Sequence, residues 1–200
     1  MQRNRLEAFS DGVLAILITI MVLELRFPEQ ALNSAAAPIT RLDSLKEPLL
    51  SYVMSFIALA IYWNNHHHLL HTVNRVTGRI LWANMHLLFW LSLIPFTTHW
   101  LSIDSFDPVG TSFYGVVLVL SGISYKILQT QIIREHGQDH VLAQAVGKDY
   151  KGIASVLVYL FGIVASSRAP WIGLASYGFV SLLWLVPDRR IESRFAEPEV

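Results

Sequence analysis

The sequence predicts an all-α integral membrane protein with six transmembrane helices, and three observations lead to this class. Of its 200 residues, 53% are hydrophobic and only 15% are charged, whereas soluble domains carry about 25% charged residues. The mean hydropathy is +0.43. The charged residues are concentrated between long apolar stretches, and a helix needs about 20 apolar residues to cross the hydrocarbon core. We therefore expect a single transmembrane domain over residues 1–200.

Six ranges are apolar enough to form the transmembrane helices. They are about 5–26, 48–73, 79–103, 109–133, 150–168 and 170–187. The last two are separated by Pro170, which cannot continue a helix, so we predict two spans joined by a tight turn. For the first range, a signal peptide cleaved near 35–37 is the alternative. Glu7 and Asp11 lie where a signal peptide needs positive charge, which favours a retained helix.

The charged residues predict an orientation and exclude several functions. With six crossings and a cytoplasmic N-terminus, eleven of the fifteen Lys and Arg residues fall on the cytoplasmic side. We therefore expect both termini in the cytoplasm and the protein in the cell membrane. Fifteen acidic residues balance the fifteen basic ones, so no basic excess is present to bind nucleic acid. The absence of Cys excludes thiolate metal sites and a Cys nucleophile.

Polar residues gather at one predicted depth, where the first span begins, the second ends and the third begins. They are Ser10, Asp11, Asn64, Asn65, His66, His67, His68, His71, Asn84 and His86. Polar groups inside a membrane need partners, so we expect Asp11 to accept hydrogen bonds from Asn or His donors of the other two spans. The alternative is a polar girdle at the lipid headgroups, where Trp63 and Trp82 would form an aromatic belt.

The histidines permit a different interpretation. His67 and His71 are spaced i, i+4, and His136 and His140 repeat that spacing, as in the membrane desaturases and hydroxylases that hold two irons. Gly137 interrupts the second pair and no third cluster follows. We therefore expect no metal and no cofactor. A histidine-rich di-metal enzyme and a proton or small-cation transporter remain the alternatives.

Three motifs resemble the transmembrane protein 175 family, the potassium channels of bacteria and endolysosomes. The first is Arg-x-x-x-Phe-Ser-Asp at 5–11, followed by Gly-Val-Leu-Ala-Ile. The second is Ile-Tyr-Trp-Asn-Asn-His-His-His at 61–68. The third combines Leu-Trp-Ala-Asn at 81–84 with the segment 89–96. The departures are small, because the family commonly has Phe, Ala and Leu-Leu at the places of Leu14, Leu17 and Ile20-Met21.

The resemblance implies a homotetramer whose first helix lines a central pore. The pore-lining positions of the family fall on Ile16, Thr19, Ile20 and Leu23. A helix-bracing network, with Phe9 packed between helices, falls on Arg5, Phe9, Ser10, Asp11, Trp63, Asn64, His66, His67 and Asn84. The implied function is a potassium-selective channel rather than an enzyme, with K⁺, membrane lipid and its own copies as partners.

The sequence also limits the mechanism of such a channel. It contains no Thr-Val-Gly-Tyr-Gly-like segment for a carbonyl filter and no helix with regularly spaced Arg for a voltage sensor. A ring of Ile16 side chains is therefore expected to form the constriction, with Ile20 and Leu23 as further layers. The Thr19 hydroxyl either adds a polar ring or bonds back to its own helix.

Overall fold

The computed structural model describes residues 2–25, 44–103, 106–137, 142 and 149–185. These residues form seven α-helices and one short 3₁₀ helix. They are α1 (Arg3–Ile20), η1 (Met21–Glu24), α4 (Lys46–His71), α5 (Gly78–Ser92), α6 (Ile94–Ile103), α7 (Pro108–His136), α9 (Tyr150–Ser166) and α10 (Pro170–Leu185). A helix lies in each of the six predicted ranges. The residues 35–37, proposed for the signal-peptide cleavage, lie outside the described part.

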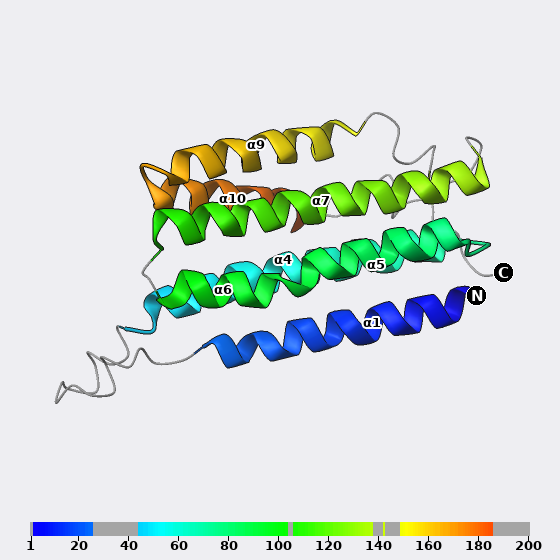
Figure 1. Ribbon diagram of the computed structural model, residues 1–200, viewed down its shortest axis with the longest axis horizontal. Helices are drawn as coiled ribbons and strands as arrows, with labels where there is room; N and C mark the ends of the chain where they lie inside the picture. Colours follow the sequence, from blue (N-terminus) through cyan, green and yellow to red (C-terminus); the bar gives the residue numbers. More distant parts are fainter. Residues whose placement is uncertain (1, 26–43, 104–105, 138–141, 143–148, 186–200) are drawn as a thin grey trace.

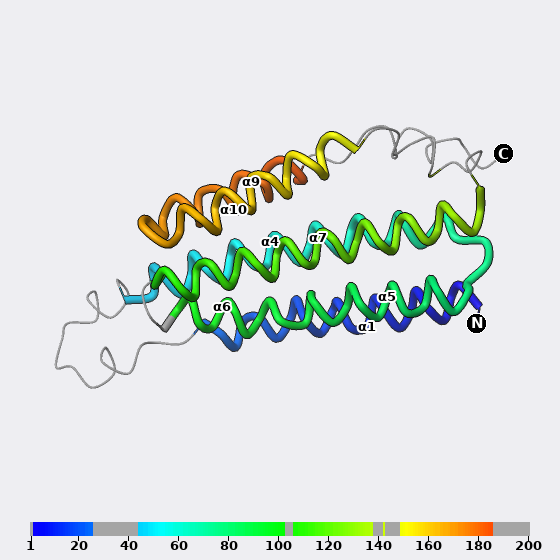
Figure 2. The backbone as a smooth tube through the Cα atoms, turned by 45° about the horizontal axis from the view of Figure 1, so that its top comes forward, coloured from blue at the N-terminus to red at the C-terminus, as the bar shows by residue number. Residues whose placement is uncertain are grey.

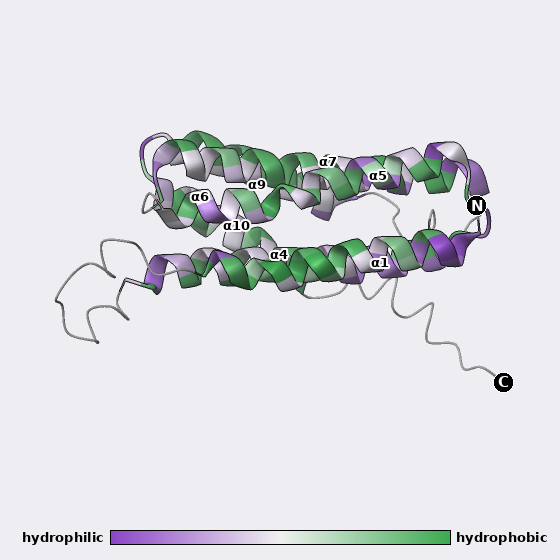
Figure 3. Cartoon of the chain, turned by 60° about the horizontal axis from the view of Figure 1, so that its bottom comes forward, coloured by the Kyte–Doolittle hydropathy of each residue, from purple (hydrophilic) through white to green (hydrophobic). Residues whose placement is uncertain are grey.

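Several of the described helices have the length and composition of membrane spans. In the described part, three segments are long and apolar enough to cross a membrane, namely Arg3–Glu24, Gly78–Ser102 and Pro108–His136. Helix α4 has 26 residues, and its Asn and His residues lower its hydropathy. Helices α9 and α10 are apolar but shorter, with 17 and 16 residues. Hydrophobic colours fill the middles of the helices and hydrophilic colours lie near their ends (Figure 3).

The third predicted span is two helices rather than one. Helix α5 ends at Ser92 and α6 begins at Ile94, with Leu93 between them. Pro95 has no backbone N–H to donate, and it disfavours helical geometry at the residue before it. The Leu93 N–H bonds to the Trp90 carbonyl at 3.2 Å, and the Thr97 N–H bonds to the Leu93 carbonyl at 3.0 Å. The helical direction therefore continues across the break.

The helices lie side by side, and successive helices alternate in direction except for α6, which continues the direction of α5. Helix α1 lies at one side of the bundle, and α9 and α10 lie at the other (Figures 1 and 2). Helix α1 packs against α4 and α5, and α7 packs against α5, α6 and α9. Asp107 begins α7 by accepting hydrogen bonds from the Val109 and Gly110 N–H groups, at 2.7 and 3.0 Å. Asp149 caps α9 through the Gly152 N–H at 2.9 Å.

The predicted tight turn before Pro170 is confirmed. Helix α9 ends at Ser166 and α10 begins at Pro170, and the two helices pack against each other. Their contact is close because small residues face each other, as is common between membrane helices. A Cβ at Gly173 would clash with the Ser166 Oγ and lie 3.0 Å from the Gly162 carbonyl oxygen.

We expect Gly173→Ala to destabilise the bundle by about 1–3 kcal/mol, because the added methyl forces the two backbones apart. The matched control is Gly178→Ala on the same helix, where an added Cβ would meet nothing within 4 Å. That change should leave stability unchanged or raise it by up to about 1 kcal/mol through helix propensity. Thermal unfolding in detergent measures both variants, and equal melting temperatures would contradict the close contact.

Candidate functional site

Helix α1 has one buried face and one unusually exposed face. Its buried hydrophobic side chains are Leu6, Leu14, Leu17 and, in η1, Met21. In the segment Arg3–Glu24, 28% of an 18-residue apolar stretch is buried. The corresponding shares are 50% in Gly78–Ser102 and 44% in Pro108–His136. Of these three segments, the one that contains α1 therefore has the smallest buried share.

The residues predicted to line a pore lie on the exposed face of α1 and η1. Ile16 is 62% exposed, Ile20 36% and Leu23 58%, and the Thr19 side chain is exposed as well. We call Ile16, Thr19, Ile20 and Leu23 the aliphatic face. A contiguous apolar face of this kind needs lipid or another chain to cover it.

The Thr19 hydroxyl bonds back to its own helix. Its Oγ1 donates to the Ala15 carbonyl at 2.8 Å and lies 3.1 Å from the Ile16 carbonyl. The hydroxyl proton is therefore used within α1, as threonine commonly does in helices. The oxygen lone pairs remain on the exposed face, so Thr19 offers an acceptor there rather than a donor.

Three buried side chains connect α1, α4 and α5. The Asn84 Nδ2 donates to the Ser10 Oγ at 2.9 Å, and the His66 Nε2 lies 2.7 Å from the Asn84 Oδ1. All three residues have exposures of 0%. We call Ser10, Asn84 and His66 the buried triad.

The bond directions in the buried triad follow from the Ser10 hydroxyl. Its Oγ donates to the Leu6 carbonyl at 2.9 Å, so it has only acceptor capacity left for Asn84. The Asn84 amide nitrogen therefore faces Ser10 and its oxygen faces His66. The His66 ring must then carry its proton on Nε2 and donate to that oxygen.

Asp11 differs from the sequence-based expectation. Its Oδ1 accepts a hydrogen bond from the Trp63 indole Nε1 at 3.2 Å, whereas we expected Asn or His donors. The reason is the rotation of α1, which turns Ser10 inward towards Asn84 and leaves Asp11 at the edge of the α1–α4 contact. Trp63 also stacks on His67, with ring centroids 6.1 Å apart.

Three other members of the predicted network are more exposed than the buried triad. Phe9 is 48% exposed, so it does not pack between helices of the same chain as expected. The Arg5 side chain is exposed and Asn64 is half-buried. The sequence motif therefore marks residues of two kinds, those that join helices in the subunit and those left on its surface.

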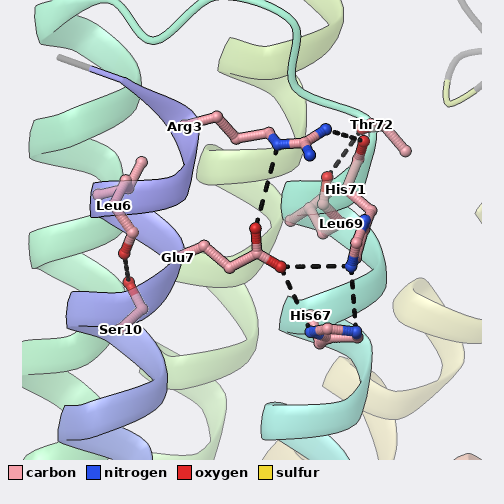
Figure 4. Close-up of polar contacts among 8 residues, drawn as sticks. All are labelled: Arg3, Leu6, Glu7, Ser10, His67, Leu69, His71 and Thr72. Carbon is pink, nitrogen blue, oxygen red and sulfur yellow. Dashed lines mark hydrogen bonds and ion pairs between the residues drawn. The ribbon is translucent and has the colours of Figure 1, made fainter.

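A second polar cluster lies nearer the start of α1 (Figure 4). The Glu7 Oε1 lies 3.5 Å from the His67 Nδ1 and 3.3 Å from the His71 Nε2. The two histidines approach each other at 3.1 Å between their Nε2 atoms. Sequence reasoning included His67 but missed Glu7. The sequence did contain an indication of Glu7, because this residue lies one helical turn before Asp11 and therefore near the predicted level of the histidines.

The four-histidine metal site is not formed. The His136 Nε2 accepts the backbone N–H groups of Asn74 and Arg75, at 3.0 and 3.2 Å. The His136 Nδ1 lies 2.9 Å from the Ile132 carbonyl, so both ring nitrogens are used within the fold. His140 lies outside the described residues. His136 therefore fixes the connection between α4 and α5 instead of completing a pair with His67 and His71.

The chain is similar to known potassium channels in sequence. The sequence profile described as Endosomal/lysosomal potassium channel TMEM175 matches residues 5–95. A protein of Chryseobacterium sp. named a potassium channel is 48% identical over 199 residues, covering 98% of this chain and 100% of its own. A potassium channel of Chamaesiphon minutus is 32% identical over 130 residues, or 64% of each chain.

The fold agrees with this assignment. The crystal structure of a lysosomal potassium-selective channel TMEM175 homolog from Chamaesiphon minutus superposes with a TM-score of 0.81 and 25% identity, covering 93% of this chain and 97% of that one. The apolar helical bundle and these matches define a multi-pass membrane protein related to ion channels. The chain belongs to the TMEM175 family.

Proposed function

We propose that four copies of this chain form a potassium-selective channel whose pore is lined by the aliphatic face of α1. One α1 helix cannot enclose a pore, whereas four helices around an axis can. The observation that carries the proposal is that Ile16, Ile20 and Leu23 are exposed in the subunit while the opposite side of α1 is buried. The relatives named as potassium channels support K⁺ as the permeant ion.

Selectivity in this proposal comes from dehydration at an apolar constriction. A ring of Ile16 side chains gives a passing ion no oxygen ligands, so the ion must shed part of its hydration shell there. Losing water costs more for Na⁺ than for the larger K⁺, which favours K⁺ modestly. Wetting and dewetting of the same ring opens and closes the path.

The buried triad and the Asp11–Trp63 bond have a bracing role in this proposal. They join the cytoplasmic half of α1 to α4 and α5 and so fix the rotation that turns Ile16 towards the axis. The channel lies in the cell membrane in this proposal. Each chain is oriented as its positive charges favour, with both termini in the cytoplasm.

The test is ion flux through the purified chain in liposomes. We expect downhill K⁺ flux without added metal, a smaller Na⁺ flux, and a mass of four chains by native mass spectrometry. Saturable exchange of protons for K⁺ would instead indicate a transporter. No flux from a folded tetramer, or a monomeric mass, would contradict the proposal.

A further inference from the structure

Glu7, His67 and His71 present metal-binding atoms that converge from two helices. One ligand atom from each residue can be chosen so that all three lie within 4.8 Å of one another. Glu7 belongs to α1, and the two histidines occupy one face in the last turns of α4. Their i, i+4 spacing puts both imidazoles on the side of α4 that faces Glu7, as the close-up shows (Figure 4).

The distances suit a small divalent ion. With bonds of about 2.0–2.1 Å to His nitrogen and carboxylate oxygen, two ligands of a tetrahedral zinc ion lie about 3.3–3.4 Å apart. The His71 Nε2 lies 3.3 Å from the Glu7 Oε1 and 3.1 Å from the His67 Nε2. These two ligand–ligand distances are close to those of a metal-bound set. His67 turns its Nδ1 towards the Glu7 Oε1, at 3.5 Å, and its Nε2 towards His71, so this ring must shift to bind the ion through one nitrogen.

The surroundings position the ligands and leave an approach for the ion. The Arg3 Nε lies 4.0 Å from the Glu7 Oε2, which leaves the Oε1 directed at the histidines. The Arg3 Nη1 donates to the His71 carbonyl at 3.2 Å. The end of α4 is the negative pole of its helix dipole, which favours a cation there. The side chains of His67 and His71 are 38% and 44% exposed, so the site is open at the surface of the helical bundle.

We propose that Glu7, His67 and His71 bind one divalent transition-metal ion, such as Zn²⁺, with water completing its coordination. Two imidazoles and one carboxylate form a recurrent zinc ligand set, and a water commonly occupies the fourth position. This departs from our expectation of no metal. The ion would join the start of α1 to the end of α4.

The experiment measures Zn²⁺ binding to the full-length chain, purified in detergent after chelation and dialysis. We expect calorimetry and elemental analysis to give one Zn²⁺ per chain, and X-ray absorption to show two imidazole ligands. Because loss of even an outer-shell partner costs about 10–100-fold in affinity, His71→Gln and Glu7→Gln should each weaken binding by about 100-fold or more. Zinc should also raise the melting temperature of the unmodified protein.

The matched control is His86→Gln, which removes a histidine bonded to Trp90 on α5, outside this cluster. It should retain full binding. If His71→Gln fails to give a monodisperse protein, His67→Gln tests the same ligand set. Binding that survives these substitutions, or no binding by the unmodified protein at 100-fold molar excess of zinc, would overturn the proposal. Because binding is measured directly, its outcome does not depend on whether the protein conducts K⁺.

Discussion

Replacing Ile16 by Asn should abolish most of the discrimination between K⁺ and Na⁺ and raise the ion flux. Ile16 is 62% exposed on α1, and in the proposed tetramer four such side chains form the constriction. Four Asn amides would supply oxygen and nitrogen partners at the place where ions must otherwise lose water. The dehydration penalty then falls for both ions, and the permeability ratio approaches about 1. Liposome flux in K⁺ and Na⁺ gradients measures the change.

The control is Val164→Asn on α9, an aliphatic residue that is 66% exposed. The same amide is introduced at a similar exposure, but on the opposite side of the subunit, so flux and selectivity should stay unchanged. If Ile16→Asn leaves both quantities as they were, or Val164→Asn alters them equally, the constriction lies elsewhere. A structure of the assembly with Ile16 facing lipid would contradict the proposal in the same way.

Replacing Asn84 by Leu should destabilise the subunit by about 1–3 kcal/mol, because it leaves buried polar groups without partners. The His66 Nε2–H would lose its acceptor, and the Ser10 Oγ would lose its donor. An unpaired buried donor costs about 1–3 kcal/mol, although interhelical hydrogen bonds in membrane proteins average nearer 0.6 kcal/mol. Thermal unfolding in detergent measures the loss. Flux should decline as well, since α1 loses a contact that fixes its rotation.

Asn65→Leu is the matched control for this prediction. The Asn65 side chain donates to the Ile61 carbonyl of its own helix at 2.9 Å, so the same substitution on α4 removes no bond between helices. Its stability should change by less than that of Asn84→Leu. An equal loss in both variants would show that the buried triad does not hold the helices together.

Much of the fold can be predicted from the sequence, because the local composition of a segment indicates whether it forms a membrane span. A span needs a run of apolar residues wherever it occurs, so the six helical ranges are visible without tertiary information. Pro170 likewise predicts the α9–α10 turn by its covalent geometry alone. The break at Leu93 was missed because Pro95 lies inside an apolar run that is long enough for one span. A proline in a membrane helix is compatible with either a kink or a break.

The sequence by itself determined the class of protein, the helical ranges, the family and the presence of polar residues near the ends of three neighbouring helices. Only the tertiary structure decided the pairing within that layer: Ser10 rather than Asp11 meets Asn84, Trp63 donates to Asp11, and Glu7 joins His67 and His71. The physical reason is that hydropathy specifies how deep a residue lies, whereas its partner depends on how each helix is rotated. That rotation results from the packing of α1 against α4 and α5 together.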